Sequence, residues 1–265
     1  MLCLGNIACN FSYLCRRKFI ISKTEMQEEN YSVIFEDNHL IAINKPAGWL
    51  VQGDETGDTP LSEYVKEYIK VRYEKPGDVF LGTVHRIDRP VSGVVIFART
   101  SKALERMNKL FEERKVQKTY LAIVERRPEE LEGTLLHYIA KDQEKNVVHV
   151  ATSQKNKHYK LAKLEYKLLA GLGDHYLLEV KPHTGRPHQI RAQLGKIGCP
   201  IRGDLKYGAK RTNADGRIHL HSASLEFIHP VQLTPVVIKA SLPNEQLWRL
   251  FKQALSDLPY YKELV

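Results

Sequence analysis

The sequence predicts an α+β fold, with one domain built on a largely antiparallel β-sheet. Short apolar runs follow one another between Gly133 and Leu169, and charged turns such as Lys141–Asn146 separate them. This spacing favours an antiparallel sheet over βαβ units. Two segments with apolar residues at helical spacing lie nearer the start of the chain. No internal repeat, low-complexity tract or Pro/Gly/Ser-rich linker divides the sequence after Tyr31.

The first half of the domain alternates strands with two amphipathic helices. Thr59 is an N-cap candidate with Pro60 at the first helical position, and Ser101 is the N-cap candidate of the second helix. Runs rich in β-branched and aromatic residues predict strands at Ser32–Glu36, Leu40–Asn44, Val79–Val84, Val94–Ala98 and Lys118–Val124.

The second half is richer in strands. Pro187 is expected to open a short helix, and Asn244 to cap a final helix whose apolar side carries Leu247 and Leu250. Strands are predicted at Thr134–Ala140, Val147–Ala151, Tyr159–Leu168, His175–Lys181, Arg217–Phe227 and Val236–Ala240.

The charge of the chain points to a polyanionic partner. The 265 residues carry a formal net charge of +9, with a sequence pI of about 9.2. Such an excess favours RNA or DNA over a membrane, although a basic surface that serves only solubility would give the same total. No apolar run approaches the length of a membrane span.

The start of the chain differs from the rest. Three of the four Cys lie in the first fifteen residues, and no CxxC pair exists. Neither a zinc site nor a disulfide framework is supported, so we expect a reducing, cytoplasmic location. The cations at residues 16–18 follow the apolar residues, unlike those of a signal peptide. We expect residues 1–30 to be a leader or disordered tail, Met26 to be the true start, and residues 31–265 to form the domain.

The stretch His85–Gly93, HRIDRPVSG, lies between two predicted strands and is the first candidate site. Asp88 is flanked by Arg86 and Arg89, and Pro90 favours a loop because its φ is fixed. A carboxylate near fixed cations stays ionised even when it is partly buried. A structural ion pair on a loop would give the same local pattern.

Two further stretches place charged and aromatic groups in tight loops. In His183–Arg191, HTGRPHQIR, Arg191 follows the apolar Ile190, and a buried Arg needs an anion such as a phosphate or the carboxylate of Asp88. In Gly203–Gly208, GDLKYG, two Gly bracket Asp204 and Tyr207. Eight Lys/Arg and two Asp lie between Arg186 and Arg217, which suits an RNA backbone unless these cations are merely solvated.

The histidines do not predict a metal site. No HExxH or HxH–carboxylate arrangement is present, so structural or RNA-contacting roles are the better interpretation. The residues considered were His183, His188, His219, His221 and His229.

Six motifs together resemble the RluA-type pseudouridine synthases from about Tyr31 to about Leu255. Each motif alone is weak, but six in order with the family's usual spacing are highly specific. They are NKPAG at Asn44–Gly48, HRID and SG within His85–Gly93, KTYLA at Lys118–Ala122, TGRPHQIR at Thr184–Arg191, GDLKYG at Gly203–Gly208 and LHSASLEFIHP at Leu220–Pro230.

The resemblance implies a mixed, mostly antiparallel sheet with flanking helices around a central cleft. It also implies isomerisation of uridine to pseudouridine in ribosomal or transfer RNA, without a cofactor or metal. By position in the motifs, Asp88 is the essential aspartate, Tyr120 packs against the target base and Arg191 pairs with the aspartate. Residue types alone leave open whether the aspartate attacks the sugar, attacks the ring or removes a sugar proton. RNA contacts are expected from Arg86, which would hold the nucleotide out of the helix, and from Lys45, His85, Arg186, His188 and Tyr207.

The chain departs from the family pattern at two points. Val91 stands where a Thr is common, beside the unusual Pro90, although the Asp88 loop is expected to survive. The sequence before Tyr31 is too short for the S4-type RNA-binding module of many relatives, so target selection is expected within the catalytic domain, and a monomer is our default. The alternative function is a non-catalytic RNA-binding protein of ribosome assembly. A glycosidase is disfavoured because only Asp88 provides a carboxylate in a matching motif.

Overall fold

The computed structural model describes residues 31–213 and 215–265, and Val33–Val265 form one compact unit. The predicted leader or disordered tail over residues 1–30 and the predicted true start at Met26 lie outside the described residues. The strands are β1 (Ser32–Glu36), β2 (Leu40–Lys45), β3 (Gly82–Thr83), β4 (Ser92–Ala98), β5 (Gln117–Val124), β6 (Glu132–Asp142), β7 (Val147–Ala151), β8 (Lys160–Leu172), β9 (His175–Pro182), β10 (Leu220–Ile228) and β11 (Pro235–Lys239).

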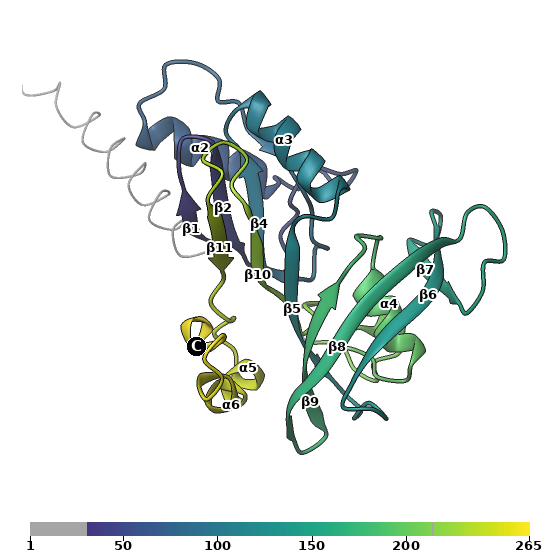
Figure 1. The fold of residues 1–265 in the computed structure, drawn as a ribbon. Coiled ribbons are helices and arrows are strands. Elements are labelled where there is room, and N and C mark those ends of the chain that lie inside the picture. The colour runs from purple at the N-terminus through teal and green to yellow at the C-terminus, as the bar shows by residue number, and fades with distance from the viewer. Residues whose placement is uncertain (1–30, 214) are drawn as a thin grey trace, which may run out of the picture. The chain divides into compact units, whose positions relative to one another are not determined.

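All these strands belong to one 11-stranded sheet (Figure 1). Its order is β1, β2, β4, β10, β5, β9, β8, β6 and β7, while β11 pairs with β10 and β3 pairs with β4. Among the described strand pairs with a defined register, only β4 and β10 run parallel. The α+β class and the mostly antiparallel sheet are therefore confirmed.

Two long helices accompany the strands of the first half, α2 (Leu61–Arg72) and α3 (Ser101–Glu112). Ala103 and Met107 of α3 pack on β2, β4, β10 and β11. All seven residues of β4 are buried, so both faces of this strand are covered, which explains its unbroken apolar run. The N-caps are Pro60 and Thr100, each one residue away from the predicted Thr59 and Ser101. Thr100 caps its helix because its side chain accepts the Ala103 N–H at 3.2 Å.

The strands of the second half alternate in burial. In β8, Ala162, Leu164 and Tyr166 are buried and their neighbours are more exposed, as a sheet with one covered face requires. The helix α4 (Gln189–Lys196) contributes Ala192 to a small core with β6, β7 and β8. The C-terminal helices pack Trp248 against β5, β9 and β10.

Several predicted boundaries were wrong. The strand predicted at Val79–Val84 is reduced to β3, and the strand predicted from Arg217 starts at Leu220. The helix expected to open at Pro187 begins at Gln189. The predicted single C-terminal helix, with Asn244 as its cap, is two short helices, α5 (Gln246–Leu250) after Glu245 and α6 (Lys252–Ser256).

The parallel pair β4–β10 positions the candidate site. His221 lies opposite Ser92 at the start of β4, and Ser222 lies opposite Tyr120 on β5. The buried Ser92 hydroxyl and His221 Nδ1 are 2.8 Å apart, which ties the two strand starts together. The loop before β4, which carries Asp88, is thereby held next to Tyr120. Among the described residues, no helix has both the length and the apolar composition needed to cross a bilayer.

Candidate active site

The Asp88 loop is fixed by its own turn and by the motif that follows β2. The Val91 N–H donates to the Asp88 carbonyl at 3.0 Å, which closes the turn around Pro90. The Gly48 N–H donates to the Arg89 carbonyl at 2.8 Å, and the Arg89 guanidinium donates back to the Gly48 carbonyl at 2.9 Å. Two motifs that are far apart in the sequence therefore lock one backbone conformation at Asp88.

Lys45 lies fully buried beneath this loop. Its ammonium donates to the carbonyls of Pro46, Trp49 and Arg89 at 2.9, 2.9 and 3.1 Å. Burial lowers the pKa of Lys45 to about 7, although Asp88 acts in the opposite direction. Since the side chain is 0% exposed, the structure gives no support to the predicted contact of Lys45 with RNA. Lys45 instead supports the loop that carries Asp88.

Arg191 on α4 is clamped between two carboxylates. It donates to Asp88 Oδ2 through one terminal nitrogen at 2.9 Å, and to both oxygens of Asp204 at 2.7 and 2.9 Å. Burial acts to lower the pKa of Arg191, but Asp204 and Asp88 outweigh it and the pKa is raised. The guanidinium therefore stays charged, and its position is fixed independently of Asp88.

Asp88 itself remains accessible. Its side chain is 28% exposed, whereas that of Asp204 is 1% exposed. Arg191 contacts only the Oδ2 atom of Asp88. The second carboxylate oxygen is consequently left for a substrate.

The loop that leads into α4 is held by Gln189 and by a strained residue. The buried Gln189 accepts from the Thr184 hydroxyl and the Arg186 N–H, and donates to the Lys163 carbonyl. His188 has φ +48°, a left-handed conformation that side chains rarely adopt. Such strain is maintained only where the surroundings over-determine the backbone. The loop is therefore rigid where it borders Asp88.

Tyr207 positions the His188 ring. Its hydroxyl accepts the Val148 N–H at 2.9 Å and lies 2.8 Å from His188 Nδ1. His188 Nε2 is then 3.9 Å from Asp88 Oδ2. Burial holds the pKa of His188 below its usual range, and Asp88 acts against this. Arg191 also lies over the Tyr207 ring, 5.2 Å from its centroid, so Tyr207 supports both side chains that face Asp88.

Tyr120 borders the same cleft from β5. Burial raises the pKa of its phenol to about 12, and the charge of Asp88 acts in the same direction. The phenol is therefore neutral at physiological pH. An aromatic ring at this position provides a surface on which a base can pack.

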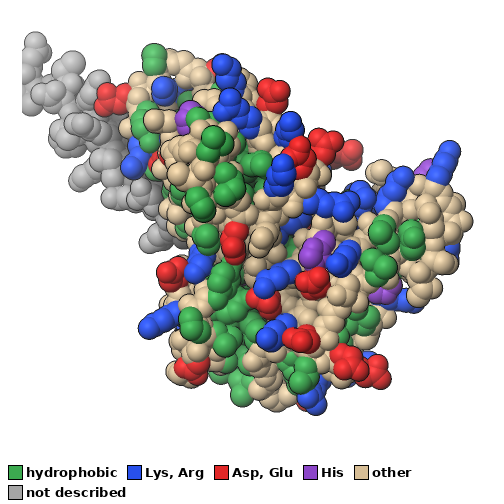
Figure 2. Space-filling view, in the orientation of Figure 1, with side chains coloured by type: hydrophobic (Ala, Val, Ile, Leu, Met, Phe, Trp, Pro, Cys, Tyr) green, Lys and Arg blue, Asp and Glu red, His purple; other side chains and the backbone are tan. Residues whose placement is uncertain are grey.

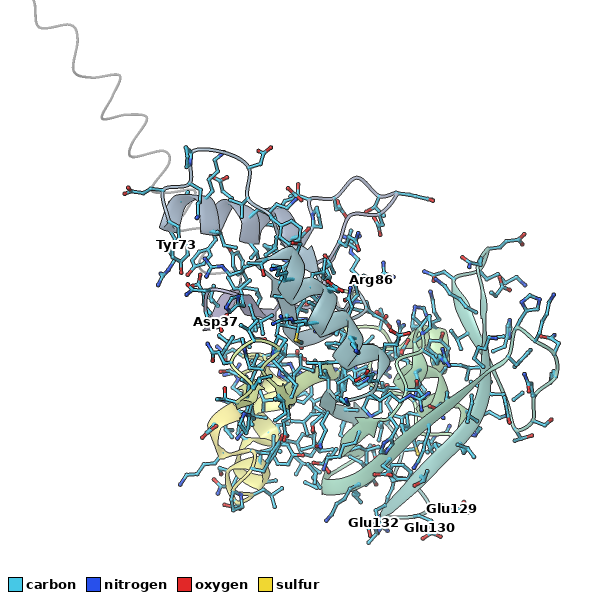
Figure 3. All side chains as sticks on the ribbon, turned by 45° about the horizontal axis from the view of Figure 1, so that its top comes forward. Asp37, Tyr73, Arg86, Glu129, Glu130 and Glu132 are labelled. Carbon is cyan, nitrogen blue, oxygen red and sulfur yellow. The ribbon has the colours of Figure 1, made fainter. Side chains whose placement is uncertain are left out.

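These groups line one cleft of about 940 Å³. Arg86 is exposed, and Figure 3 shows it on the loop that borders this region. Figure 2 shows further Lys and Arg side chains along the hollow between α3 and β6–β8. The structure brings together the predicted residues Asp88, Tyr120, Arg191, Arg86, Arg186 and His188.

His85 borders the cleft, but its ring is also engaged in contacts within the protein. Its Nε2 accepts the Ile96 N–H at 3.2 Å, and its ring stacks on Phe111 with centroids 5.0 Å apart. Burial lowers the pKa of His85 to about 3, with a further contribution from Lys118. The ring is therefore neutral and is engaged in structural contacts, and its contact with RNA stays a prediction.

Two supporting residues were not predicted in their present roles. Asp204 accepts two hydrogen bonds from Arg191, and Gln189 accepts hydrogen bonds from the loop before α4. The only signal for Asp204 was its position between two Gly in GDLKYG. Within residues 31–213 and 215–265, no three His, Cys, Asp or Glu side chains are placed to hold a metal ion.

Comparison with known proteins gives concordant matches. A family model described as RNA pseudouridylate synthase matches residues 39–196. The tRNA pseudouridine synthase C of Vibrio parahaemolyticus serotype O3:K6 is 33% identical over 238 residues, covering 83% of this chain and 94% of that protein. The ribosomal large subunit pseudouridine synthase C of Buchnera aphidicola subsp. Schizaphis graminum is 32% identical over 229 residues, covering 82% of this chain and 69% of that protein. The match to the Pectobacterium carotovorum tRNA pseudouridine synthase C, 32% identical, spans 58% of that protein.

The fold is also similar to solved structures. Human RNA pseudouridylate synthase domain containing 4 superposes with a TM-score of 0.69 at 22% identity. The superposition covers 92% of this chain and 97% of the human chain.

Proposed function

The chain belongs to the RNA pseudouridylate synthase family and is an isomerase of RNA. We propose that Asp88, Tyr120 and Arg191 convert uridine to pseudouridine in transfer RNA or large-subunit ribosomal RNA. The observation that carries the proposal is the clamp on Arg191. It keeps a guanidinium 2.9 Å from one oxygen of Asp88, whose side chain lines the cleft. A carboxylate in this setting can act as nucleophile or base.

The reaction requires a uridine to leave its stack. Extrusion costs a few kcal/mol, and contacts in the pocket must offset this. Tyr120 offers a neutral aromatic face beside Asp88, and the exposed Arg86 can occupy the space that the base leaves. Once the N–C glycosidic bond has broken, the cleft walls hold the detached uracil while it turns. A carbon of the ring then bonds to the sugar in place of the nitrogen.

The substrate assignment rests on two lines of support. Relatives with similar identity are named for transfer RNA and for large-subunit ribosomal RNA. The net charge of +9 suits either polyanion. We further propose that the protein acts in the cytoplasm as a monomer and uses no metal or other cofactor.

The test is conversion of uridine by the purified protein. RNA from cells that lack this protein is incubated with the parent, with Asp88→Ala and with Asp78→Ala, an exposed control. Pseudouridines are then mapped in the transfer and ribosomal RNA fractions. We expect Asp88→Ala to reduce the rate at least about 10³-fold, and the control to match the parent. Equal activity of Asp88→Ala and the parent would reject the proposal and favour a non-catalytic RNA-binding protein.

A further inference from the structure

Lys118 on β5 is a partly buried cation for which the described residues provide no carboxylate partner. Nearby lysines differ in this respect. Lys163 lies 3.6 Å from Glu165, and Lys181 lies 3.0 Å from Glu179. Lys118 thus lacks the carboxylate partner that each of these two lysines has.

Lys118 lies where two hollows meet. It borders the catalytic cleft and also a neighbouring groove of about 1310 Å³, to which Arg114 and Arg186 contribute. A side-chain carbon built on Gly185 would be 3.8 Å from the Lys118 ammonium, so the ammonium lies against the backbone of this loop.

The spacing from Tyr120 matches a position next to the target nucleotide. Residues two apart on a strand point to the same face and lie about 6.5 Å apart. A base that packs on Tyr120 therefore places a neighbouring part of its own RNA strand near Lys118.

The energetics also favour an anion at this position. Burial lowers the pKa of Lys118, and the nearby charge of Arg114 lowers it further. A desolvated charge without a partner is costly, and a bound anion offsets that cost. Among anions, a phosphodiester is the group that RNA supplies along its whole length.

We propose that Lys118 binds a backbone phosphate of the substrate RNA beside the extruded uridine and directs that strand from the catalytic cleft into the groove lined by Arg114 and Arg186. This inference rests on the proposed function for the identity of the ligand. It assigns a contact to a residue with no chemical step of its own.

The test compares Lys118→Met, Lys118→Arg and a matched control, Lys115→Met. Lys115 lies three residues earlier, is exposed and pairs with Glu113 at 2.7 Å. Binding is measured between about 50 and 200 mM salt, using transfer RNA and large-subunit ribosomal RNA fragments from cells that lack this protein. Thermal unfolding is measured in parallel.

We expect Lys118→Met to bind RNA about three- to ten-fold more weakly. The slope of the logarithm of the binding constant against the logarithm of the salt concentration should fall in magnitude by about 0.7–0.9, which corresponds to one phosphate contact. Lys118→Arg should keep the slope, and Lys115→Met should behave as the parent. The Tm of Lys118→Met should be unchanged or higher, because an uncompensated charge is removed. A lower Tm with an unchanged slope would instead identify Lys118 as structural.

Three results would overturn the inference: parent-like affinity and slope in Lys118→Met, equal losses in Lys118→Met and Lys118→Arg, or an equal loss in Lys115→Met. None of these binding measurements requires turnover. A parent that forms no pseudouridine but shows the Lys118-dependent slope would reject the proposed reaction and leave the phosphate contact standing. A parent that forms pseudouridine without that dependence would reject only the contact.

Discussion

Lys45 shows how a single buried charge couples the catalytic loop to pH. Its pKa is lowered from 10.5 to about 7, chiefly by burial. Between these two pH values the unfolded chain binds one more proton than the folded chain. Raising the pH across this window therefore favours the folded state.

We predict that Lys45→Met removes this part of the pH dependence. The free energy of unfolding of the parent should rise between about pH 7 and pH 10 relative to that of the variant. Urea unfolding at several pH values measures this difference. Lys66→Met, which removes a partly exposed lysine paired with Glu63, serves as the control and should follow the parent. Parallel curves for the parent and Lys45→Met would contradict the prediction.

At the residue scale, the sequence predicted which charges would meet better than which would be buried. The pairing of Asp88 with Arg191 was expected, because a buried guanidinium needs an anion and both residues lie in recognisable motifs. The additional partner Asp204 was not expected, because it depends on how the loop before η1 (Leu205–Tyr207) folds against α4. The burial of Lys45 was not expected for the same reason: it is a property of the assembled loop.

At the scale of the elements, the parallel pairing of β4 with β10 depends on Gly93. This residue has φ +110°, and a side-chain carbon there would lie 2.2 Å from the Ser222 carbonyl oxygen. Only glycine permits both the conformation and the close approach. This pairing is what aligns Asp88 with Tyr120.

We predict that Gly93→Ala lowers the free energy of unfolding by about 2–5 kcal/mol, through backbone strain and overpacking combined. Gly57→Ala is the matched control, since Gly57 also has a positive φ, +77°, but meets no atom within 4 Å. The control should lose only about 1–2 kcal/mol, the cost of the left-handed conformation. Urea unfolding of both variants provides the comparison, and equal losses would show that contact with β10 is unimportant.

The elements were predicted well where a periodic pattern decides them and less well where tertiary contacts do. β2 follows from its apolar run with two Ile, and β8 follows from its alternation of apolar and charged residues. The apolar run at Val79–Val84 had the composition of a strand but pairs only at Gly82–Thr83, because the chain must leave the sheet to form the Asp88 loop. The C-terminal helix divides at Phe251, which is 1% exposed and packs into the core.

At the scale of the whole molecule, the sheet continues without interruption from β1 to β7 through β10 and β5. The two Trp residues lie outside the strands and pack in different regions of the domain. Trp49 packs on Tyr64 of α2, with ring centroids 4.8 Å apart, and Trp248 packs on β5 and β10.

A continuous sheet predicts one cooperative unfolding transition. In Trp49→Phe and in Trp248→Phe, the remaining Trp reports on a different region by fluorescence, while circular dichroism reports on the whole domain. We expect the fluorescence and dichroism midpoints in urea to coincide within each variant. Separate midpoints would show that the two regions unfold independently. The class of fold was predictable at this scale, but the strand order was not, because sequence patterns do not specify which strands become neighbours.

The pairing of Arg191 with two carboxylates, those of Asp88 and Asp204, has a consequence for turnover. If the carboxylate of Asp88 gives up its charge or its hydrogen bond during a catalytic cycle, the guanidinium keeps its two bonds to Asp204. The cation therefore need not swing away and return between cycles, and the acid that reacts regains the same neighbour each time. Because Asp204 stays paired with Arg191, Asp88 can change its charge or its bonding without displacing the guanidinium.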